Sequence, residues 1–365
     1  MKNSQHTNSR HSVRLSGGGI FSIGAANRCF LTLLFFAALS ALATAQGRYT
    51  VNRPQMTMPQ AQTPALPEEM LEEYVPQHTI PIPWETEYEY AMKTAEQSSR
   101  CLLIYLCADD NDTFVPEALS HFPVEAACRK FDTEILDDGF VRSGLDRYVL
   151  LKLPMDATVP DDEGLEQSIY SLPGFEHMTG LPGLVVIDFA RRDAPYYKEV
   201  VGILPFLKGD CPTPKQTETF LYLPPGTLTQ RTLTYAVRVH PDQPLSSDGE
   251  PLPIVVQETT AHVLYQAERG VISHQNFGVR SNRVREVLGG GSPSEICAQC
   301  QSGLSLFEGA IACMRLWRHS SAHWSIARRH QTYYGYDMVR GRNGAWYAVG
   351  FFMDFPNRSL SEEEP

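Results

Sequence analysis

Two tryptophans, two histidines and two adjacent serines lie within residues 317–326, near the C-terminal end of the chain. The apolar positions that lead up to Trp317 recur at three- and four-residue spacing, which predicts a helix that ends near His319. The chain would then turn at Ser320, so that His323 lies just past a helix end and its side chain points into a cleft. A packed cluster of tryptophan and histidine in the core is the alternative interpretation of the same residues.

The cysteines are a second group that could carry chemistry. The sequence has eight, and Cys29 falls in a predicted leader, so an odd number remains and at least one thiol stays free or pairs between chains. The spacing Cys297-x-x-Cys300 suits zinc or redox chemistry, but no second pair follows, which argues against a four-cysteine zinc site. We expect one structural disulfide and one free thiol among the late cysteines, with Cys300 and Cys313 joined if the loop between them folds back.

The start of the chain has the pattern of a signal peptide. Residues 1–28 are basic and lack acidic side chains, an apolar run follows to Leu42, and Ala43-Thr44-Ala45 is a small-x-small cleavage site. We therefore expect cleavage near Ala45-Gln46 and export to the periplasm or the extracellular space. An uncleaved membrane anchor is the alternative, although the run is short for a membrane span.

Composition limits the partners of the exported part. The formal net charge of −11 argues against nucleic acid and against an anionic membrane surface as the main partner. Residues 46–82 are rich in proline, glutamine, methionine and threonine and are predicted to be a disordered linker. Residues 357–365 are predicted to be an acidic tail. No later stretch is apolar enough for a stable transmembrane span after cleavage.

Residues 83–225 alternate between helical and strand patterns, which predicts an α/β fold with a central sheet. Continuous apolar runs are typical of buried strands, whereas three- and four-residue spacing of apolar positions indicates helices. The predicted strands are 101–108, 148–153, 183–189 and 196–203, and the predicted helices are 87–100 and 123–136, with a further turn at 141–147.

This part of the chain resembles the thioredoxin fold. The resemblance rests on the helix that follows Trp84, the strand 101–108, the helix around Cys128 and the Leu181-Pro182 pair before the next strand. It implies that Pro182 is the counterpart of the cis-proline that faces the active loop. Cys128 matches the second cysteine of the redox motif, but Glu125 stands at the first position, so two-cysteine exchange is lost. Cys128 is then either a lone reactive thiol or a buried structural cysteine.

The last third of the chain begins with a predicted helix at 229–240, which could serve both domains. A proline- and serine-rich join at 241–253 follows it. Gly289-Gly290-Gly291 is a loop, and a phosphate-binding role is not expected because neither a preceding strand nor a following lysine is present. The remaining predicted elements are helices at 254–268 and 305–319, strands at 332–338 and 346–352, and a hairpin turn at 340–344.

Residues 226–356 resemble the CAP superfamily (cysteine-rich secretory, antigen 5 and pathogenesis-related proteins) in its bacterial SCP-like form. Four motifs occur in the family's order. They are Ser273-His274 after a helix, the acidic Ser294-Glu295-Ile296 segment, Trp317 at a helix end with Ser320-Ser321-Ala322-His323, and a closing Trp346-Tyr347 strand. The resemblance implies a CAP-type α-β-α sandwich after the thioredoxin-like domain.

The same resemblance implies a cleft lined by His274, Glu295 and His323, with Trp317 and Ser320 beside them. Ser320 occupies the slot of the family's second glutamate, so the set is incomplete, and Glu308 is only a candidate substitute. Two imidazoles facing one another with a carboxylate suit a divalent metal such as zinc, with His274 and His323 as ligands. Hydrogen bonding that merely holds the cleft together is the alternative.

Three functions follow from these residues. The first is an exported, non-enzymatic binding protein for a small apolar ligand or a protein partner. The second is a metal-dependent hydrolase, with Glu295 as general base or, less favourably, with Ser320 or Ser321 as nucleophile. The third is a thiol oxidoreductase that uses Cys128 or the Cys297/Cys300 pair. The missing thiol and the incomplete His/Glu set favour the first.

Overall fold

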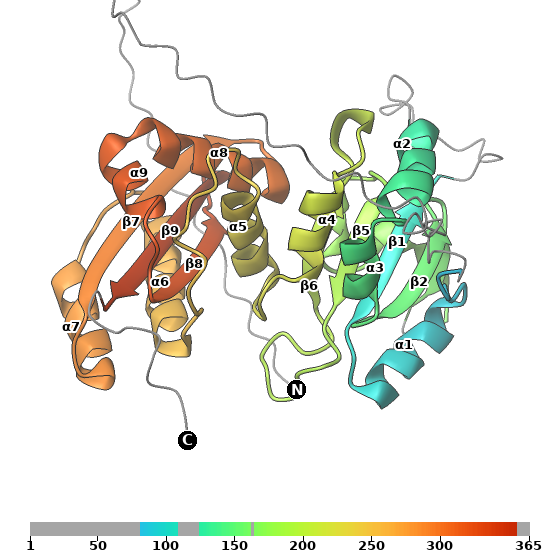
Figure 1. Cartoon of the computed structure of the whole chain (residues 1–365), viewed down its shortest axis with the longest axis horizontal. Helices are drawn as coiled ribbons and strands as arrows, with labels where there is room; N and C mark the ends of the chain where they lie inside the picture. Colours follow the sequence, from blue (N-terminus) through green and yellow to red (C-terminus); the bar gives the residue numbers. More distant parts are fainter. Residues whose placement is uncertain (1–80, 109–123, 162–163, 356–365) are drawn as a thin grey trace, which may run out of the picture. The chain divides into compact units, whose positions relative to one another are not determined.

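The computed structural model describes residues 81–108, 124–161 and 164–355. The predicted signal peptide, the linker up to residue 80 and the acidic tail from residue 357 lie outside these residues. The described chain has two main sheets with helices packed on both, which confirms the predicted α/β class (Figure 1). Within the described residues, no helix combines the length and the apolar character needed to cross a membrane.

The first sheet has four strands in the order β2-β1-β5-β6. β1 runs parallel to β2 and antiparallel to β5, and β6 is antiparallel to β5. Every residue of β1 is buried, as its unbroken apolar run predicts, because helices cover both faces of the sheet. The strands are β1 (Leu102–Cys107), β2 (Val149–Pro154), β5 (Gly183–Ile187) and β6 (Val200–Pro205).

Helix α1 (Tyr88–Ser98) packs on one face of this sheet, and α2 (Val124–Lys130), α3 (Gly139–Leu145) and α4 (Pro214–Leu221) belong to the core on the other face. The sequence reading missed α4, although Thr213 and Gln216 form a capping box at its start. The smaller elements are η3 (Phe131–Ile135), which continues α2, together with β3 (Thr158–Pro160), β4 (Glu166–Ser168), η4 (Ile169–Ser171), η5 (Phe175–Met178) and η6 (Leu207–Gly209).

The second sheet is antiparallel, with three strands in the order β7-β9-β8. The two closing strands and the hairpin turn between them are confirmed as β8 (Tyr333–Arg340) and β9 (Ala345–Asp354). The edge strand β7 (Ser292–Ser302) was not predicted, and it carries Glu295.

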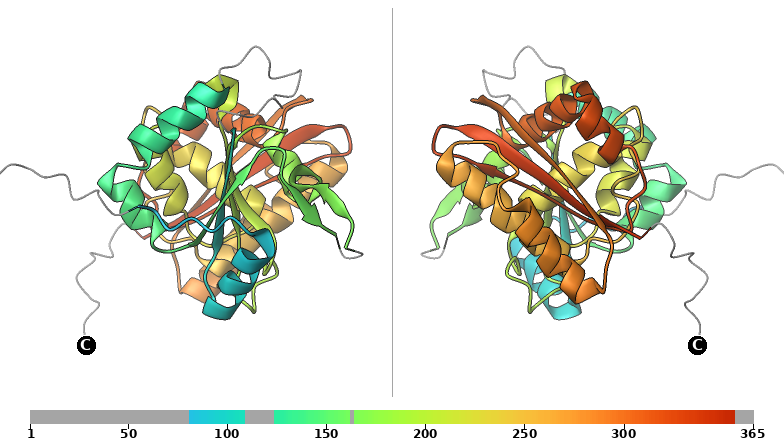
Figure 2. Two further views of the ribbon diagram at one scale, coloured as in Figure 1. Left: turned by 90° about the vertical axis from the view of Figure 1, so that its right-hand side faces the viewer. Right: turned by 90° about the vertical axis from the view of Figure 1, so that its left-hand side faces the viewer.

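Helices cover both faces of the second sheet (Figures 1 and 2). On one face, α6 (Pro253–Arg269) and α7 (Phe277–Leu288) pack against β9 through residues such as Val255, Val284 and Phe351. On the other face, α8 (Leu306–His319) packs against β7 and β9, and the short α9 (Ser321–Ala327) follows it.

Helix α5 (Leu228–Arg238) contacts strands of both sheets, namely β6 and β8. Its apolar residues Leu233, Ala236 and Val237 belong to a hydrophobic core that includes side chains from each sheet. The start of α5 is fixed by Asp337 of β8, a residue that is 3% exposed. Its carboxylate accepts hydrogen bonds from the hydroxyls of Thr229 (2.7 Å) and of Thr260 in α6 (2.6 Å).

Replacing Asp337 with alanine should lower the free energy of unfolding by about 2–4 kcal/mol, because half-buried hydroxyl donors on two helices would lose their buried acceptor. Urea unfolding followed by circular dichroism measures this loss. Asp337→Asn keeps one acceptor oxygen and should cost less than Asp337→Ala. Equal stability of the alanine variant and the unmodified chain would show that these hydrogen bonds do not hold α5.

The carboxyl group of Asp337 should also make the free energy of unfolding depend on pH, and the direction of its pKa shift gives the sign. Burial raises the pKa of Asp337, so the folded chain holds this proton more tightly than the unfolded chain does. Its contribution to the free energy of unfolding should therefore fall as the pH rises from about 4, the pKa of an unfolded aspartate, through the raised folded value. Asp337→Asn should lose this part of the pH dependence of the urea midpoint.

Candidate functional site

Glu295 lies at the centre of the candidate site. Its side chain is 1% exposed, and one carboxylate oxygen accepts a hydrogen bond from His274 Nδ1 at 2.8 Å. The other oxygen accepts a hydrogen bond from Arg280 Nη1. The structure thus brings together the predicted residues His274 and Glu295, although they are separated by a whole helix in the sequence, and it adds an arginine that the sequence analysis missed.

Arg280 reaches this carboxylate from α7. Its side chain is 5% exposed and lies within 6 Å of the rings of Phe277 and Phe351, at 5.9 and 5.7 Å. A buried guanidinium needs a carboxylate partner, and Glu295 supplies it. A sequence signal was weak here, because the buried face of α7 also contains Ser281 and so lacks an apolar stripe.

Two polar residues of α6 bind the backbone of Ser273 and so hold the segment that carries His274. His262 Nε2 lies 2.7 Å from the carbonyl oxygen of Ser273, and Gln266 Nε2 lies 2.9 Å from the same oxygen. Burial lowers the pKa of His262, which favours the neutral imidazole, and its Nε2 also lies 2.8 Å from Gln266 Nε2. Both residues were missed as site residues. Their signal was a histidine and a glutamine four residues apart on the predicted buried face of one helix.

His323 lies in the first turn of α9, and its ring centroid is 6.3 Å from that of His274. The structure therefore places the two predicted imidazoles side by side. Burial, and then the neighbouring His274, lower the pKa of His323. Ser320 is the N-cap of α9, and its hydroxyl accepts a hydrogen bond from His323 N at 3.5 Å. Ser320 thus has a capping role, which accounts for its position next to the histidine.

The prediction that Trp317 lines the cleft is wrong. Its side chain is fully buried at the end of α8 and packs against Tyr336, with ring centroids 5.8 Å apart. The cause is the helical spacing itself, because the stripe that identified the helix faces the sheet. Trp317 is therefore a core residue, as the alternative interpretation had it.

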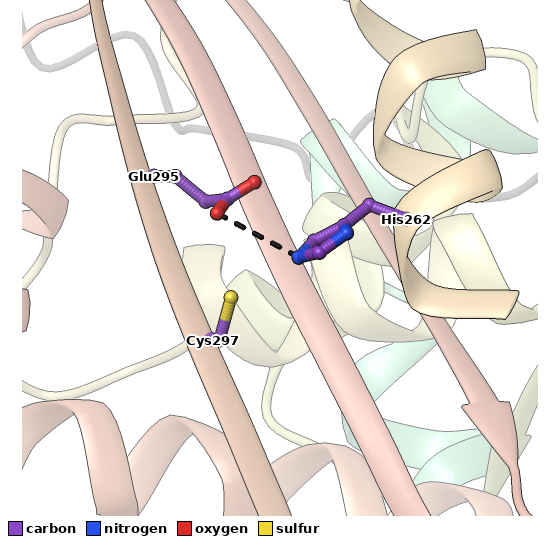
Figure 3. A group of neighbouring side chains, drawn as sticks. All are labelled: His262, Glu295 and Cys297. Atoms are coloured by element: carbon purple, nitrogen blue, oxygen red, sulfur yellow. Dashed lines mark ion pairs between the residues drawn. The ribbon is translucent and has the colours of Figure 1, made fainter. Parts of the chain in front are cut away.

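His262, Glu295 and Cys297 also form a compact group, with ligand atoms within 4.8 Å of one another (Figure 3). This group is poorly suited to a metal ion. Arg280 already neutralises Glu295, and a cation placed there would lie beside a guanidinium. Burial raises the pKa of Cys297 and keeps it a protonated thiol, whereas metals bind the thiolate. The more exposed pair His274 and His323 is the better donor set.

Neither thiol arrangement considered for redox chemistry is assembled. Cys128 is 1% exposed, its sulfur accepts a hydrogen bond from Ala108 N at 3.3 Å, and burial raises its pKa, so it is a poor nucleophile. No disulfide bond joins any two of the seven cysteines in the described residues. The expected cis peptide bond at Pro182 is wrong, since the described chain has no cis peptide bond. The carbonyl of Pro182 accepts a hydrogen bond from Phe206 N at 2.8 Å, which continues the pairing of β5 with β6.

The chain was compared with protein-family models, with curated proteins and with solved structures, and none of the three comparisons gave a match. The resemblances to the thioredoxin fold and to the CAP superfamily therefore rest on the motifs described above. The function has to be argued from the site itself.

Proposed function

We propose that this chain is an exported, non-enzymatic binding protein whose binding groups are the imidazoles of His274 and His323. In this proposal, residues 83–225 form a redox-silent thioredoxin-like domain and residues 226–356 form a CAP-type domain. The observation that carries the proposal is the state of Glu295, which is buried with both oxygens engaged, by His274 and by Arg280.

This state of Glu295 argues against the hydrolase alternative. A general base must reach a proton on the substrate or on a water, and the carboxylate of Glu295 is 1% exposed and already accepts two charge-assisted or polar hydrogen bonds. Glu295 instead orients His274. Because Nδ1 of the imidazole donates to Glu295, a neutral ring carries its lone pair on Nε2, away from the carboxylate.

A histidine oriented by a carboxylate in this way is the usual environment of a metal ligand. With His323 beside it, the site offers two imidazole donors to a divalent metal such as zinc. Two protein ligands leave coordination positions for a group of a partner molecule. Val271 and Ile272, which precede Ser273-His274, are 57% and 42% exposed and offer apolar contact to such a partner.

Calorimetric titration of the full chain with zinc chloride tests the proposal. We expect binding of one zinc ion per chain that is lost in His274→Ala and in His323→Ala. Glu295→Gln keeps both ligands but weakens their orientation, and should weaken binding by about tenfold or more. His330→Ala, which removes an exposed histidine outside the site, is the matched control and should bind as the unmodified chain does.

Zinc binding that survives both substitutions, with the fold intact by circular dichroism, would rule out this pair as the site. Zinc-dependent hydrolysis of ester or peptide substrates that disappears in His274→Ala would contradict the non-enzymatic assignment and favour the hydrolase.

A further inference from the structure

The alternation of side chains along β7 separates the two cysteines of the Cys297-x-x-Cys300 motif. Successive residues of a strand point to opposite faces, so positions three apart do not share a face. Cys297 faces α6, where its sulfur lies 3.2 Å from Gln266 Nε2. Cys300 belongs with Ile296 and Ala298 to the core beneath α8. The two cysteines of the motif therefore cannot pair with each other in the folded sheet.

Cys300 has a different neighbour, Cys313 of α8. Both residues belong to the core between β7 and α8, they are 5% and 0% exposed, and their thiols interact electrostatically. α8 packs directly on β7, so the contact joins facing elements of one core. The interaction with Cys313 lowers the pKa of the Cys300 thiol, whereas the same interaction together with burial raises the pKa of Cys313. Cys300 is thus the sulfur that is more readily ionised.

We propose that Cys300 and Cys313 form a disulfide bond between β7 and α8 when the chain folds in the presence of a small-molecule or protein disulfide. The Cys300 thiolate attacks one sulfur of the oxidant, whose disulfide bond breaks and releases one thiolate. The Cys313 thiol then loses its proton and attacks the Cys300 sulfur, which releases the second thiolate. The two cysteines lose two protons and two electrons, and the oxidant is reduced to two thiols.

The bond would tie together the elements that carry the two halves of the candidate site. β7 carries Glu295, and α8 leads through Ser320 to His323. The inference does not depend on the proposed function, because it needs only the packing of α8 on β7. Since both sulfurs are buried in the folded chain, the reaction takes place while α8 docks on the sheet.

The test is refolding of the full chain in glutathione buffers, followed by alkylation of free thiols and peptide mass analysis. Cleavage after Glu308 separates the peptide with Cys297 and Cys300 from the peptide with Cys313. In oxidised glutathione we expect these two peptides to be joined, with a mass two hydrogens lower than their sum. The oxidised chain should also melt about 5–10 °C higher than the reduced chain.

Variants assign the bond to its sulfurs. Cys297→Ala should keep the joined peptides, whereas Cys300→Ala and Cys313→Ala should lose both the joined peptides and the difference in melting temperature. A bond between Cys297 and Cys300, or free thiols at both Cys300 and Cys313 after folding in oxidised glutathione, would overturn the inference. Joined peptides in Cys300→Ala would also overturn it, because they would assign the bond to Cys297.

Discussion

Replacing Arg280 with methionine should lower the free energy of unfolding by about 3–5 kcal/mol, one of the two largest effects that we expect from a single substitution. The methionine keeps much of the volume between Phe277 and Phe351 but leaves the carboxylate of Glu295 buried without its cation. The change is measured by urea unfolding at neutral pH, with the slope against urea compared to confirm that the unfolded states are alike.

Arg283 provides a matched control on the same helix. It pairs with Glu258 at 2.7 Å, but its side chain is 54% exposed, so Arg283→Met should cost less than about 1 kcal/mol. Adding Glu295→Gln to Arg280→Met removes the unpaired charge and should recover part of the loss. If Arg280→Met and Arg283→Met were equally mild, the buried ion pair would not be a determinant of stability.

Trp317→Ala should also lower the free energy of unfolding by about 3–5 kcal/mol, since the side chain is fully buried between α8 and the sheet and its removal leaves a cavity. Trp317→Phe should be milder and should leave zinc binding unchanged, because Trp317 does not reach the cleft. Urea unfolding and the zinc titration measure the two outcomes separately.

The neighbouring Leu316 is a suitable comparison, because it lies on the same turn of α8 and is 44% exposed. Leu316→Ala should change the free energy of unfolding by no more than about 0.5–1 kcal/mol. Weaker zinc binding in a stably folded Trp317→Phe variant would show that Trp317 does contribute to the cleft, as the sequence analysis predicted.

Elements with a single strong pattern were predictable from the sequence. β1 was predicted because a strand that is buried on both faces consists of an unbroken apolar run. The hairpin of β8 and β9 was predicted because turn residues separate its two strands. The resemblance to the CAP superfamily implied that His274 and Glu295 line one cleft, but not that they form a hydrogen bond. Their mutual distance could be tested only in the folded chain.

Elements with mixed faces were missed. Ile296 is the only large apolar residue of β7, and this segment becomes a strand because β9 pairs along it, which no local pattern reveals. The buried side of α7 contains Arg280, so the helical spacing of apolar residues is interrupted at the residue that pairs with Glu295. His262 and Arg280 are partners of other polar groups, and such partnerships depend on distances between distant segments.

The two faces of β7 limit how the chain can change in length. Shifting this strand by one residue would turn Glu295 into the apolar layer beneath α8 and would expose Ile296 to the polar site. An insertion or deletion of one residue inside the strand would therefore move every side chain beyond it to the opposite face of the sheet. The loop at Gly289-Gly290-Gly291, where all three residues have positive φ, precedes the strand and can absorb such a change. Length variation among homologous chains should accordingly fall in the glycine loop, and the spacing from Glu295 to Cys300 should stay constant.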